Sequence, residues 1–243
     1  MFTSKRIAIS GDVFRNEHSI TFDGTNDYLN CGDVLDIGTA DFTLSIWAKA
    51  SDWDSVNLIS KHVTGNTWRW QTDNNDPPTM RYYGYTGGAF VGTYIGNTSG
   101  INLDLLKNQW VHFALSNDRN GNIVGYINGQ YDDADSSDAT DITNSGHFMI
   151  AAFGSGTVSA VTVSEAAIYN KALSASEVKT IYNGREPYNH KESSFASNLT
   201  GWWRMGDGLE RGSGTTIYDM SNNSNNGTMV NMAADDFVGD TPW

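Results

Sequence analysis

Intramolecular disulfide bridges are excluded in this chain, because its 243 residues include a single cysteine. A chain of this length buries enough apolar surface on folding to be stable without such bridges. The cysteine, Cys31, closes a strand-like run at residues 27–31. Reactive thiols need an electropositive setting that lowers their pKa. We therefore expect Cys31 to be buried and inert.

Basic residues are also scarce. Fifteen Lys and Arg stand against 28 Asp and Glu, so the formal net charge is −13 and the pI is near 4.5. Nucleic acids and anionic membrane surfaces attract clustered cations, but the densest basic run here is the pair Lys5-Arg6. We expect no nucleic-acid partner and no membrane-surface partner.

Long hydrophobic runs are missing. No stretch approaches the roughly 18 apolar residues that span a bilayer. The N-terminal sequence MFTSKRIAIS has two cations, but the apolar run behind them is too short for a secretory signal. We therefore expect the protein to act inside the cell or to leave it by another route, such as assembly into a virus particle released by lysis.

Helical periodicity is nearly absent, and alternation with a period of two residues takes its place. Apolar side chains alternate with other residues at 42–49 and 111–116, and an Asn128-Gly129 turn follows a third run at 123–127. Shorter strand-like runs lie at residues 19–22, 27–31, 57–60, 68–71, 80–83, 90–94, 148–152 and 158–169. Many short strands separated by turn residues predict a β-sandwich or barrel.

One helix is expected on the C-terminal side. Ser174 and Glu177 form a capping-box pattern, Val178 and Ile181 share a face, and Gly184 supplies a stop. The polar stretches on either side of this helix are expected to be irregular. Residues 132–141, with five carboxylates, indicate a solvated loop, and residues 185–197 indicate a linker.

Six sequence motifs occur in the order and spacing of one known family. They are ITFDGTNDYLNCG (20–32), DFTLSIWAKA (41–50), LISK (58–61), NQWVHFALS (108–116), GYINGQ (125–130) and AAIYNKALSASEV (166–178). Together they resemble successive strands of laminin-G-like, concanavalin A-like domains, over residues 19–184. The resemblance implies an all-β fold, an antiparallel two-sheet β-sandwich (jelly roll) with one short helix.

The tail resembles the same family in an unusual position. LTGWWRMGDG (199–208) and GTTIYDMSNNSNNGTMVN (214–231) look like the segment that opens such domains, yet here they close the chain. They are either returning strands at 199–231, which complete one sandwich over residues 19–243, or the start of another repeat. The first interpretation is favoured because three strand-like runs are too few to bury a core alone. Residues 1–18 are expected to form an arm that docks on a partner.

Catalytic residues are not recognisable. Glycan hydrolases of this fold use paired carboxylates that face one sugar, and the Glu-x-Asp-x-x-Glu pattern of family-16 glucanases is absent. Glu165 is the nearest candidate, but the family's neighbouring Asp is Ser164 here, so a structural role is expected. The five histidines are scattered without zinc-ligand spacing. We expect no enzyme activity.

Sugar binding is the main functional candidate, because aromatic rings stack on sugars while amides and carboxylates fix the hydroxyl groups. The densest aromatic block lies on or beside consecutive expected strands. Its candidate carbohydrate-binding residues are Trp68, Trp70, Tyr82, Tyr83, Tyr85, Tyr94, Asn74 and Arg81. The alternative is that these aromatics fill the core. About half should point inward, and the adjacent Tyr82 and Tyr83 should face opposite sides.

Calcium is the candidate metal, because hard oxygen ligands are abundant. The candidate ligands are Asp219, Asn223 and Asn225 in one Asx-rich loop, and Asp23 in another turn. The family resemblance implies a structural Ca²⁺ in such loops. The alternative is that these side chains cap turns without a metal.

Two functions of different class are expected from these observations. The first is a lectin-like module that binds a polysaccharide or cell-surface glycan, and the second is a purely structural virion protein, such as a capsid decoration or fibre component. A glycan-degrading enzyme ranks third. The chain is similar to lectin-like proteins of marine tailed bacteriophages, which implies a place in the virion, beside other virion proteins or further copies of itself. A cytoplasmic or extracellular location is the alternative.

Overall fold

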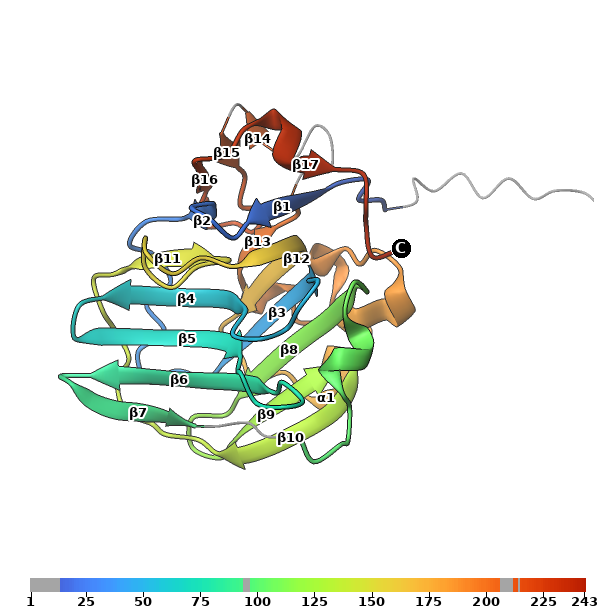
Figure 1. Ribbon diagram of the computed structural model, residues 1–243. Helices are drawn as coiled ribbons and strands as arrows, with labels where there is room; N and C mark the ends of the chain where they lie inside the picture. The colour runs from blue at the N-terminus through green and yellow to red at the C-terminus, as the bar shows by residue number, and fades with distance from the viewer. Residues whose placement is uncertain (1–13, 94–96, 206–211, 214) are drawn as a thin grey trace, which may run out of the picture.

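Two antiparallel sheets face each other in the computed structural model, which describes residues 14–93, 97–205, 212–213 and 215–243 (Figure 1). The fold class predicted from the sequence is confirmed. The eight-stranded sheet has the order β10 (Gln130–Ser136), β9 (Asn122–Ile127), β8 (Val111–Asn117), β3 (Phe42–Lys49), β12 (Ala160–Tyr169), β1 (Ser19–Asp23) and β17 (Phe237–Val238), and β13 (Leu199–Trp203) also pairs with β12.

The second sheet has nine strands and lies across the core from the first. Its order is β14 (Gly212–Ser213), β15 (Thr216–Ile217), β16 (Gly227–Val230), β2 (Tyr28–Asn30), β11 (His147–Ile150), β4 (Asn57–Val63), β5 (Asn66–Thr72), β6 (Met80–Thr86) and β7 (Ala89–Thr93). The described helices are α1 (Ala175–Tyr182) and the short 3₁₀ turns η1 (Leu103–Leu106), η2 (Asn183–Arg185), η3 (His190–Glu192), η4 (Ala196–Asn198) and η6 (Ala234–Asp236).

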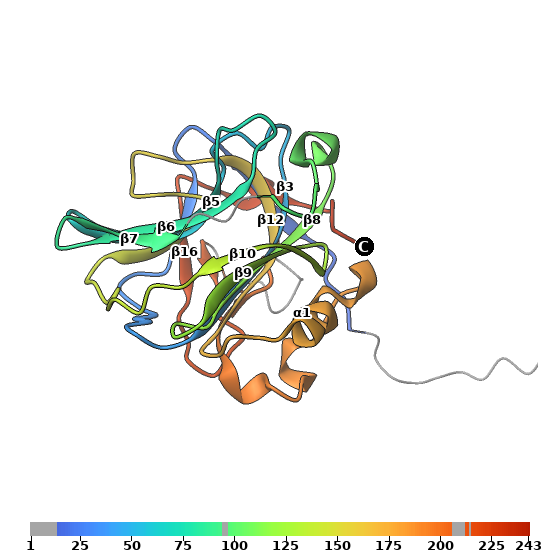
Figure 2. The same cartoon turned by 90° about the horizontal axis from the view of Figure 1, so that it is seen from below.

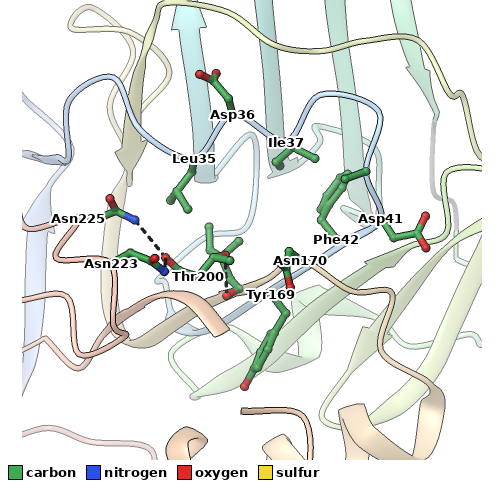
Figure 3. A pocket seen from close by; sticks show the side chains of 12 residues that line it. Leu35, Asp36, Ile37, Asp41, Phe42, Tyr169, Asn170, Thr200, Asn223 and Asn225 are labelled. Carbon is green, nitrogen blue, oxygen red and sulfur yellow. Dashed lines mark hydrogen bonds between the residues drawn. The ribbon is translucent and has the colours of Figure 1, made fainter. Parts of the chain in front are cut away.

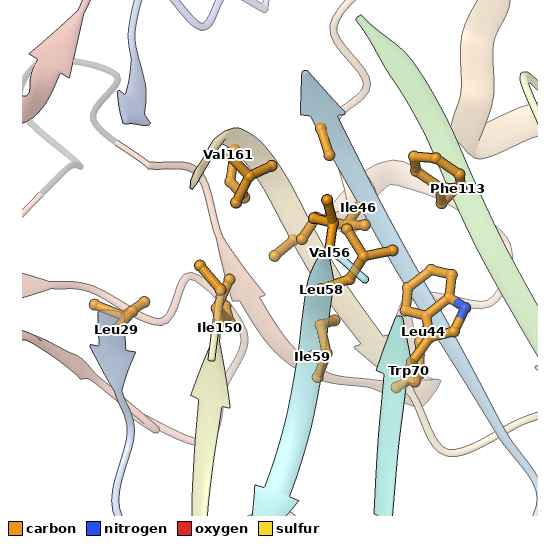
Figure 4. Close-up of a cluster of buried hydrophobic side chains, with 14 of the residues drawn as sticks. Leu29, Leu44, Ile46, Val56, Leu58, Ile59, Trp70, Phe113, Ile150 and Val161 are labelled. Atoms are coloured by element: carbon orange, nitrogen blue, oxygen red, sulfur yellow. The ribbon is translucent and has the colours of Figure 1, made fainter. Parts of the chain in front are cut away.

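The core lies between the two sheets and is built by the inward half of each strand. Figure 4 shows Leu44 and Ile46 of β3 facing Trp70 of β5 and Ile150 of β11, and all four side chains are fully buried. Burying one such side chain stabilises the fold by about 1.5–3 kcal/mol. Cys31 is buried in the same cluster, as expected, and loss of solvation there raises the pKa of its thiol.

A second apolar layer covers the outer side of the eight-stranded sheet. Figure 2 shows α1 and the segment that follows it on the side of β8–β10 away from β5–β7. We call this surface the covered face, and its buried residues are Ala114, Tyr126, Ala167, Tyr169, Leu173, Val178, Ile181, Phe195, Leu199 and Trp202. Because both sides of this sheet are covered, seven of the eight residues of β3 are buried.

Helix α1 begins and ends as the sequence predicts. The Ser174 hydroxyl accepts from the Glu177 amide, and the Glu177 carboxylate accepts from the Ser174 amide, which completes the capping box. At the other end Asn183, with φ 49°, is the cap residue, and Gly184, with φ 64°, follows it in the left-handed region as the expected stop. Asn tolerates this conformation better than most residues.

The tail contributes strands to both sheets. β13 pairs with β12 in the eight-stranded sheet, and β16 pairs with β2 in the nine-stranded sheet. The last residues of the expected N-terminal arm also pack on this body, since Phe14 lies 4.1 Å below the Arg204 guanidinium and Asn16 is buried. Residues 1–13 of the arm lie outside the described residues.

Two stretches expected to be irregular have regular structure. Residues 130–136 form β10, because backbone pairing with β9 does not depend on polar side chains. The acidic side chains of this edge strand discourage pairing with another chain. Residues 185–197 contain the 3₁₀ turn η3 and overlap η2 and η4 at their ends, and Phe195 and His190 from this stretch are buried.

Candidate functional site

The outward side chains of the nine-stranded sheet lie in rows, each made of residues that pair across neighbouring strands. One row crosses the sheet as Asn30, Met149, Ser60, Arg69 and Tyr83, and a second as His147, His62, Thr67, Tyr85 and Phe90. Gln71 and Arg81 pair in a third. We call these twelve residues, together with Phe153 from the loop after β11, the open face.

Aromatic rings and guanidinium groups interleave at the centre of the open face. Arg69 lies between the rings of Tyr83 and Phe153, with its guanidinium carbon 4.4 Å from each ring centroid. Arg81 lies 4.7 Å from the Tyr83 ring centroid. These are cation–π distances, so the Tyr83 ring is shared by two positive charges.

Exposed rings extend this cluster toward the edge of the sheet. Phe90 stacks on Tyr83 at 6.2 Å and meets Tyr85 edge-on at 5.5 Å. Tyr85 is 39% exposed and Phe90 is 53% exposed. Large apolar rings left in solvent are a feature of ligand-binding and interaction surfaces.

Electrostatic effects on the open face come from burial and from like charges. Burial, followed by the charge of Arg81, lowers the pKa of Arg69 to about 10, so the group stays protonated at neutral pH. Burial and then Arg69 lower the pKa of His62, which is therefore neutral at pH 7. The open face thus combines fixed positive charge with uncharged hydrogen-bonding groups.

A cavity lies beside this cluster, at the β11 end of the rows. Its volume is 430 Å³, and its walls include Tyr28, Asn30, His62, His147 and Met149. The His62 ring contacts Phe153 at 4.5 Å, and Phe153 in turn covers Arg69. The cavity and the aromatic cluster therefore form one continuous surface.

Three of the predicted sugar-binding residues belong to the core. Trp68 and Trp70 are fully buried and Tyr82 is 4% exposed, so none of these rings is available to stack on a sugar. The physical reason is strand alternation, which points positions 68, 70 and 82 toward the other sheet. Gly84 leaves the room that this packing needs, because a Cβ there would lie 2.5 Å from the Thr67 carbonyl oxygen.

Three other predicted residues lie on the open face, namely Tyr83, Tyr85 and Arg81. The expected contrast between neighbours is confirmed, since Tyr82 faces the core and Tyr83 faces outward. Asn74 is exposed in the loop between β5 and β6, at the Arg81 end of the open face. Tyr94 lies outside the described residues.

Sequence reasoning missed Arg69, Phe153, His62 and His147. Once the structure shows that Trp68 and Trp70 point inward, alternation along β5 places Arg69 between them on the outward side. His62 and His147 become neighbours only through the β4–β11 register, and Phe153 reaches the face from a loop. No pattern in the sequence predicts these contacts between distant residues.

A second pocket lies at one end of the sandwich (Figure 3). Its volume is 530 Å³, with an apolar wall of Leu35, Ile37 and Phe42 and polar groups from Asp36, Asp41, Asn170, Asn223 and Asn225. Most of these polar groups are already bonded within the protein, since Asp41 accepts from the Arg119 amide and Asn170 from Asn198. The pocket therefore has few polar groups to offer a ligand.

Lys61 is buried in the core and binds the loop that forms one wall of that pocket. Its ammonium group donates to the Asp33 carboxylate and to the Val34 carbonyl oxygen, both at 2.8 Å, and lies 3.1 Å from Asp36. The side chain is fully buried, and a buried charge needs such partners. Lys61 thus fixes the loop of residues 33–37.

The predicted calcium ligands of the Asx-rich loop make hydrogen bonds within the protein. Asp219 accepts from the amides of Trp202, Ser221 and Asn225 and from the Ser221 hydroxyl. The side-chain amides of Asn223 and Asn225 donate to the Thr200 carbonyl oxygen at 3.0 and 3.1 Å, as Figure 3 shows. These contacts are those of a turn-capping carboxylate.

Asp23 caps a separate turn, where its carboxylate accepts from the amides of Thr25 and Asn26. The first of these bonds is the largest cause of its lowered pKa. Within the described residues, no three His, Cys, Asp or Glu side chains are grouped to hold a metal ion.

Glu165 is held in a buried network on the covered side. Its carboxylate accepts from the Trp202 indole at 2.6 Å and from the Asn16 amide at 2.9 Å, and it lies 3.5 Å from Arg204. The side chain is 3% exposed. This placement matches the structural pairing role expected from the sequence.

None of the described helices is long and apolar enough to cross a membrane.

The sequence matches a known family model over most of its length. The family model Laminin_G_3, described as the concanavalin A-like lectin/glucanases superfamily, matches residues 23–179, which is more than half of the sequence. The chain belongs to this superfamily. The matched residues include the strands of the open face. No curated protein has a sequence that matches this laminin G-like chain.

Solved structures with the same fold come from proteins of several kinds. A Bacteroides ovatus protein to which carbohydrate binding is attributed has a TM-score of 0.64 at 18% identity, with 93% of this chain and 60% of that chain covered. The heptameric SAP-like pentraxin of Limulus polyphemus has a TM-score of 0.55 at 16% identity, over 69% and 82% of the two chains.

The binding domain of botulinum neurotoxin serotype D has a TM-score of 0.51 at 14% identity, over 72% of this chain and 44% of that one. At such identities the likeness concerns the fold. This laminin G-like chain also spans only 60% of the length of the Bacteroides structure.

Proposed function

We propose that this laminin G-like domain is a lectin-like carbohydrate-binding module that contacts sugars with its open face. The observation that carries the proposal is the exposure of Tyr85 and Phe90 beside the Arg69–Tyr83 cluster. Flat rings offer apolar faces to sugar C–H groups, and neighbouring polar groups orient the hydroxyls. The attribution of carbohydrate binding to the Bacteroides structure of the same fold supports the proposal.

Binding of a single site is expected to be modest. The open face is a shallow surface, and sugars lose strong hydration when they bind, so dissociation constants in the micromolar to millimolar range are expected. Display in many copies would raise the effective affinity.

Two tyrosine variants test where the sugar binds. Tyr85 on the open face and Tyr131 on β10 of the other sheet are both exposed, at 39% and 52%. On a glycan array, Tyr85→Ala should weaken binding of the best ligand roughly tenfold, which corresponds to about 1.4 kcal/mol, and Tyr131→Ala should match the wild type. Equal loss in both variants would remove the open face as the site, and an array without any bound glycan would end the proposal.

We further propose that the module is displayed on a bacteriophage particle for adhesion to host-surface glycans. The similarity of its motif order to lectin-like proteins of marine tailed bacteriophages supports this location. A protein inventory of purified particles tests it, because the chain should be present in stoichiometric copies. Presence in particles without glycan binding would favour the purely structural virion protein, and absence from particles would leave a cytoplasmic or extracellular location.

We also propose that the domain acts by binding alone. Glu165 has no access to a sugar, because it is buried in the network with Trp202 and Arg204. Incubation with β-glucan, alginate, agar or carrageenan should release no shorter products. Release of reducing ends or unsaturated products from any of these would establish an enzyme instead.

A further inference from the structure

We propose that the open face selects anionic polysaccharides, with the Arg69 guanidinium receiving a sulfate or carboxylate of the glycan. This inference rests on the proposed glycan-binding function and adds the class of ligand. It is carried by the surroundings of Arg69, by the charge of the face around it, and by the length of the continuous surface.

Arg69 is a charged group without a counter-charge. Its Nε is buried and has no hydrogen-bond partner, and no Asp or Glu of the described residues lies within ion-pair distance of it. Its guanidinium carbon also lies over the rings of Tyr83 and Phe153, at 4.4 Å from each centroid. A guanidinium that is partly desolvated and fixed in orientation is prepared for an anion that binds its edge through two parallel hydrogen bonds.

The charged residues of the open face are basic, whereas the chain as a whole is acidic. The chain has 28 acidic and 15 basic residues, yet the open face holds Arg69 and Arg81 and no Asp or Glu. Arg81 shares the Tyr83 ring with Arg69 and lowers the pKa of Arg69 through like-charge repulsion. An anion at Arg69 would offset that repulsion.

The extent of the surface suits a polymer. The second row crosses five strands, from β11 to β7, and strands lie about 4.8 Å apart, so the row is roughly 19 Å long. The exposed rings of Tyr85 and Phe90 lie at one end and the 430 Å³ cavity beside His62 lies at the other. Arg69 stands between these ends, where the charged group of a central sugar unit would meet it.

Two pairs of oligosaccharides test the ligand class. A κ-carrageenan oligosaccharide is compared with the same material after desulfation, and an oligogalacturonate with its methyl ester, by calorimetric titration of the full chain. In at least one pair the charged member should bind roughly tenfold or more tightly than its uncharged partner, since hydrogen bonds between charged groups are stronger than those between neutral groups. The pair that shows the preference identifies sulfate or carboxylate as the source of the anion.

Three arginine variants locate the effect. Arg69→Gln should abolish the preference for the charged member, and Arg69→Lys should keep only part of it, because Lys has the charge without the planar fork. Arg185→Gln makes the same change in net charge at an exposed position beyond α1 and should leave the preference unchanged. Thermal melting of each variant confirms that it is folded.

Charged and uncharged members binding equally well, or a preference that survives in folded Arg69→Gln, would overturn the inference. In that case Tyr85-dependent binding of uncharged glycans would leave the proposed function standing. If no glycan of either charge binds, the proposed function itself fails.

Discussion

The two outer faces of the sandwich carry the same kinds of side chain but differ in what lies above them. On the covered face, α1 and residues 183–198 bury Trp202 and Tyr169. On the open face, Tyr85 and Phe90 remain exposed beside Arg69. An outward aromatic side chain therefore stabilises the fold only where another layer covers it. Without such a layer it is available to a ligand.

The largest expected difference between the faces is in stability. Trp202→Ala should lower the free energy of unfolding by about 3–5 kcal/mol, because it leaves a cavity under the covering layer. Phe90→Ala should lower it by less than about 0.5 kcal/mol, as surface substitutions do. Urea unfolding of both variants measures this. A large loss of unfolding free energy in Phe90→Ala would mean that side chains of the open face also stabilise the fold.

The second largest expected effect is that acidification lowers the free energy of unfolding, through two buried histidines on the covered side. Burial lowers the pKa of both His112 and His190 to about 3, so the unfolded chain binds protons below pH 6.5 that the folded chain does not. Each histidine then costs up to about 1.4 kcal/mol of stability per pH unit as the pH falls from 6.5 toward 3.

Asp132 opposes this trend, because burial raises its pKa to about 6 and its protonation favours the folded state between pH 6 and 3.8. Two histidines outweigh one carboxyl, so the net loss should be about 1.4 kcal/mol per pH unit between pH 6 and 4. Urea unfolding across this range measures the slope, and His190→Gln should reduce it. Stability that rises on acidification would show that the two histidines are not buried in the neutral form.

The smallest expected effect is that of calcium on the Asx-rich loop beside the covered face. Asp219→Ala should cost about 1–3 kcal/mol, because it leaves buried amides without their acceptor. Calcium and chelator should give the same melting temperature in the wild type, since the carboxylate is already saturated by hydrogen bonds. A calcium-dependent shift that Asp219→Ala abolishes would restore the metal site.

Sequence patterns predicted the strands, the capping box and the family because these depend on local alternation and on motif order. They also predicted that Tyr82 and Tyr83 face opposite sides. They did not reveal that Trp68 and Trp70 point inward, because alternation gives the period of a strand and leaves its phase undetermined. The phase follows from what lies across each strand, and only the three-dimensional register of β4, β5 and β6 supplies that.

The candidate site was therefore predictable only in part. Tyr83, Tyr85 and Arg81 lie in one strand, so the sequence already grouped them. Phe153 joins them across the sheet from a distant loop, and its contact with Arg69 depends on the order of β11, β4 and β5.

Chemical-shift mapping tests the central claim most directly. Amide and side-chain signals of the isotopically labelled protein are followed while the oligosaccharide that ranks first on the glycan array is added. The open face should carry the ligand, so the largest shifts should fall at residues 60–69, 81–90 and 147–153, with little change at residues 174–203. Shifts concentrated on α1 and β13, or on the pocket of Figure 3 around Thr200, would contradict the assignment of the open face as the binding surface.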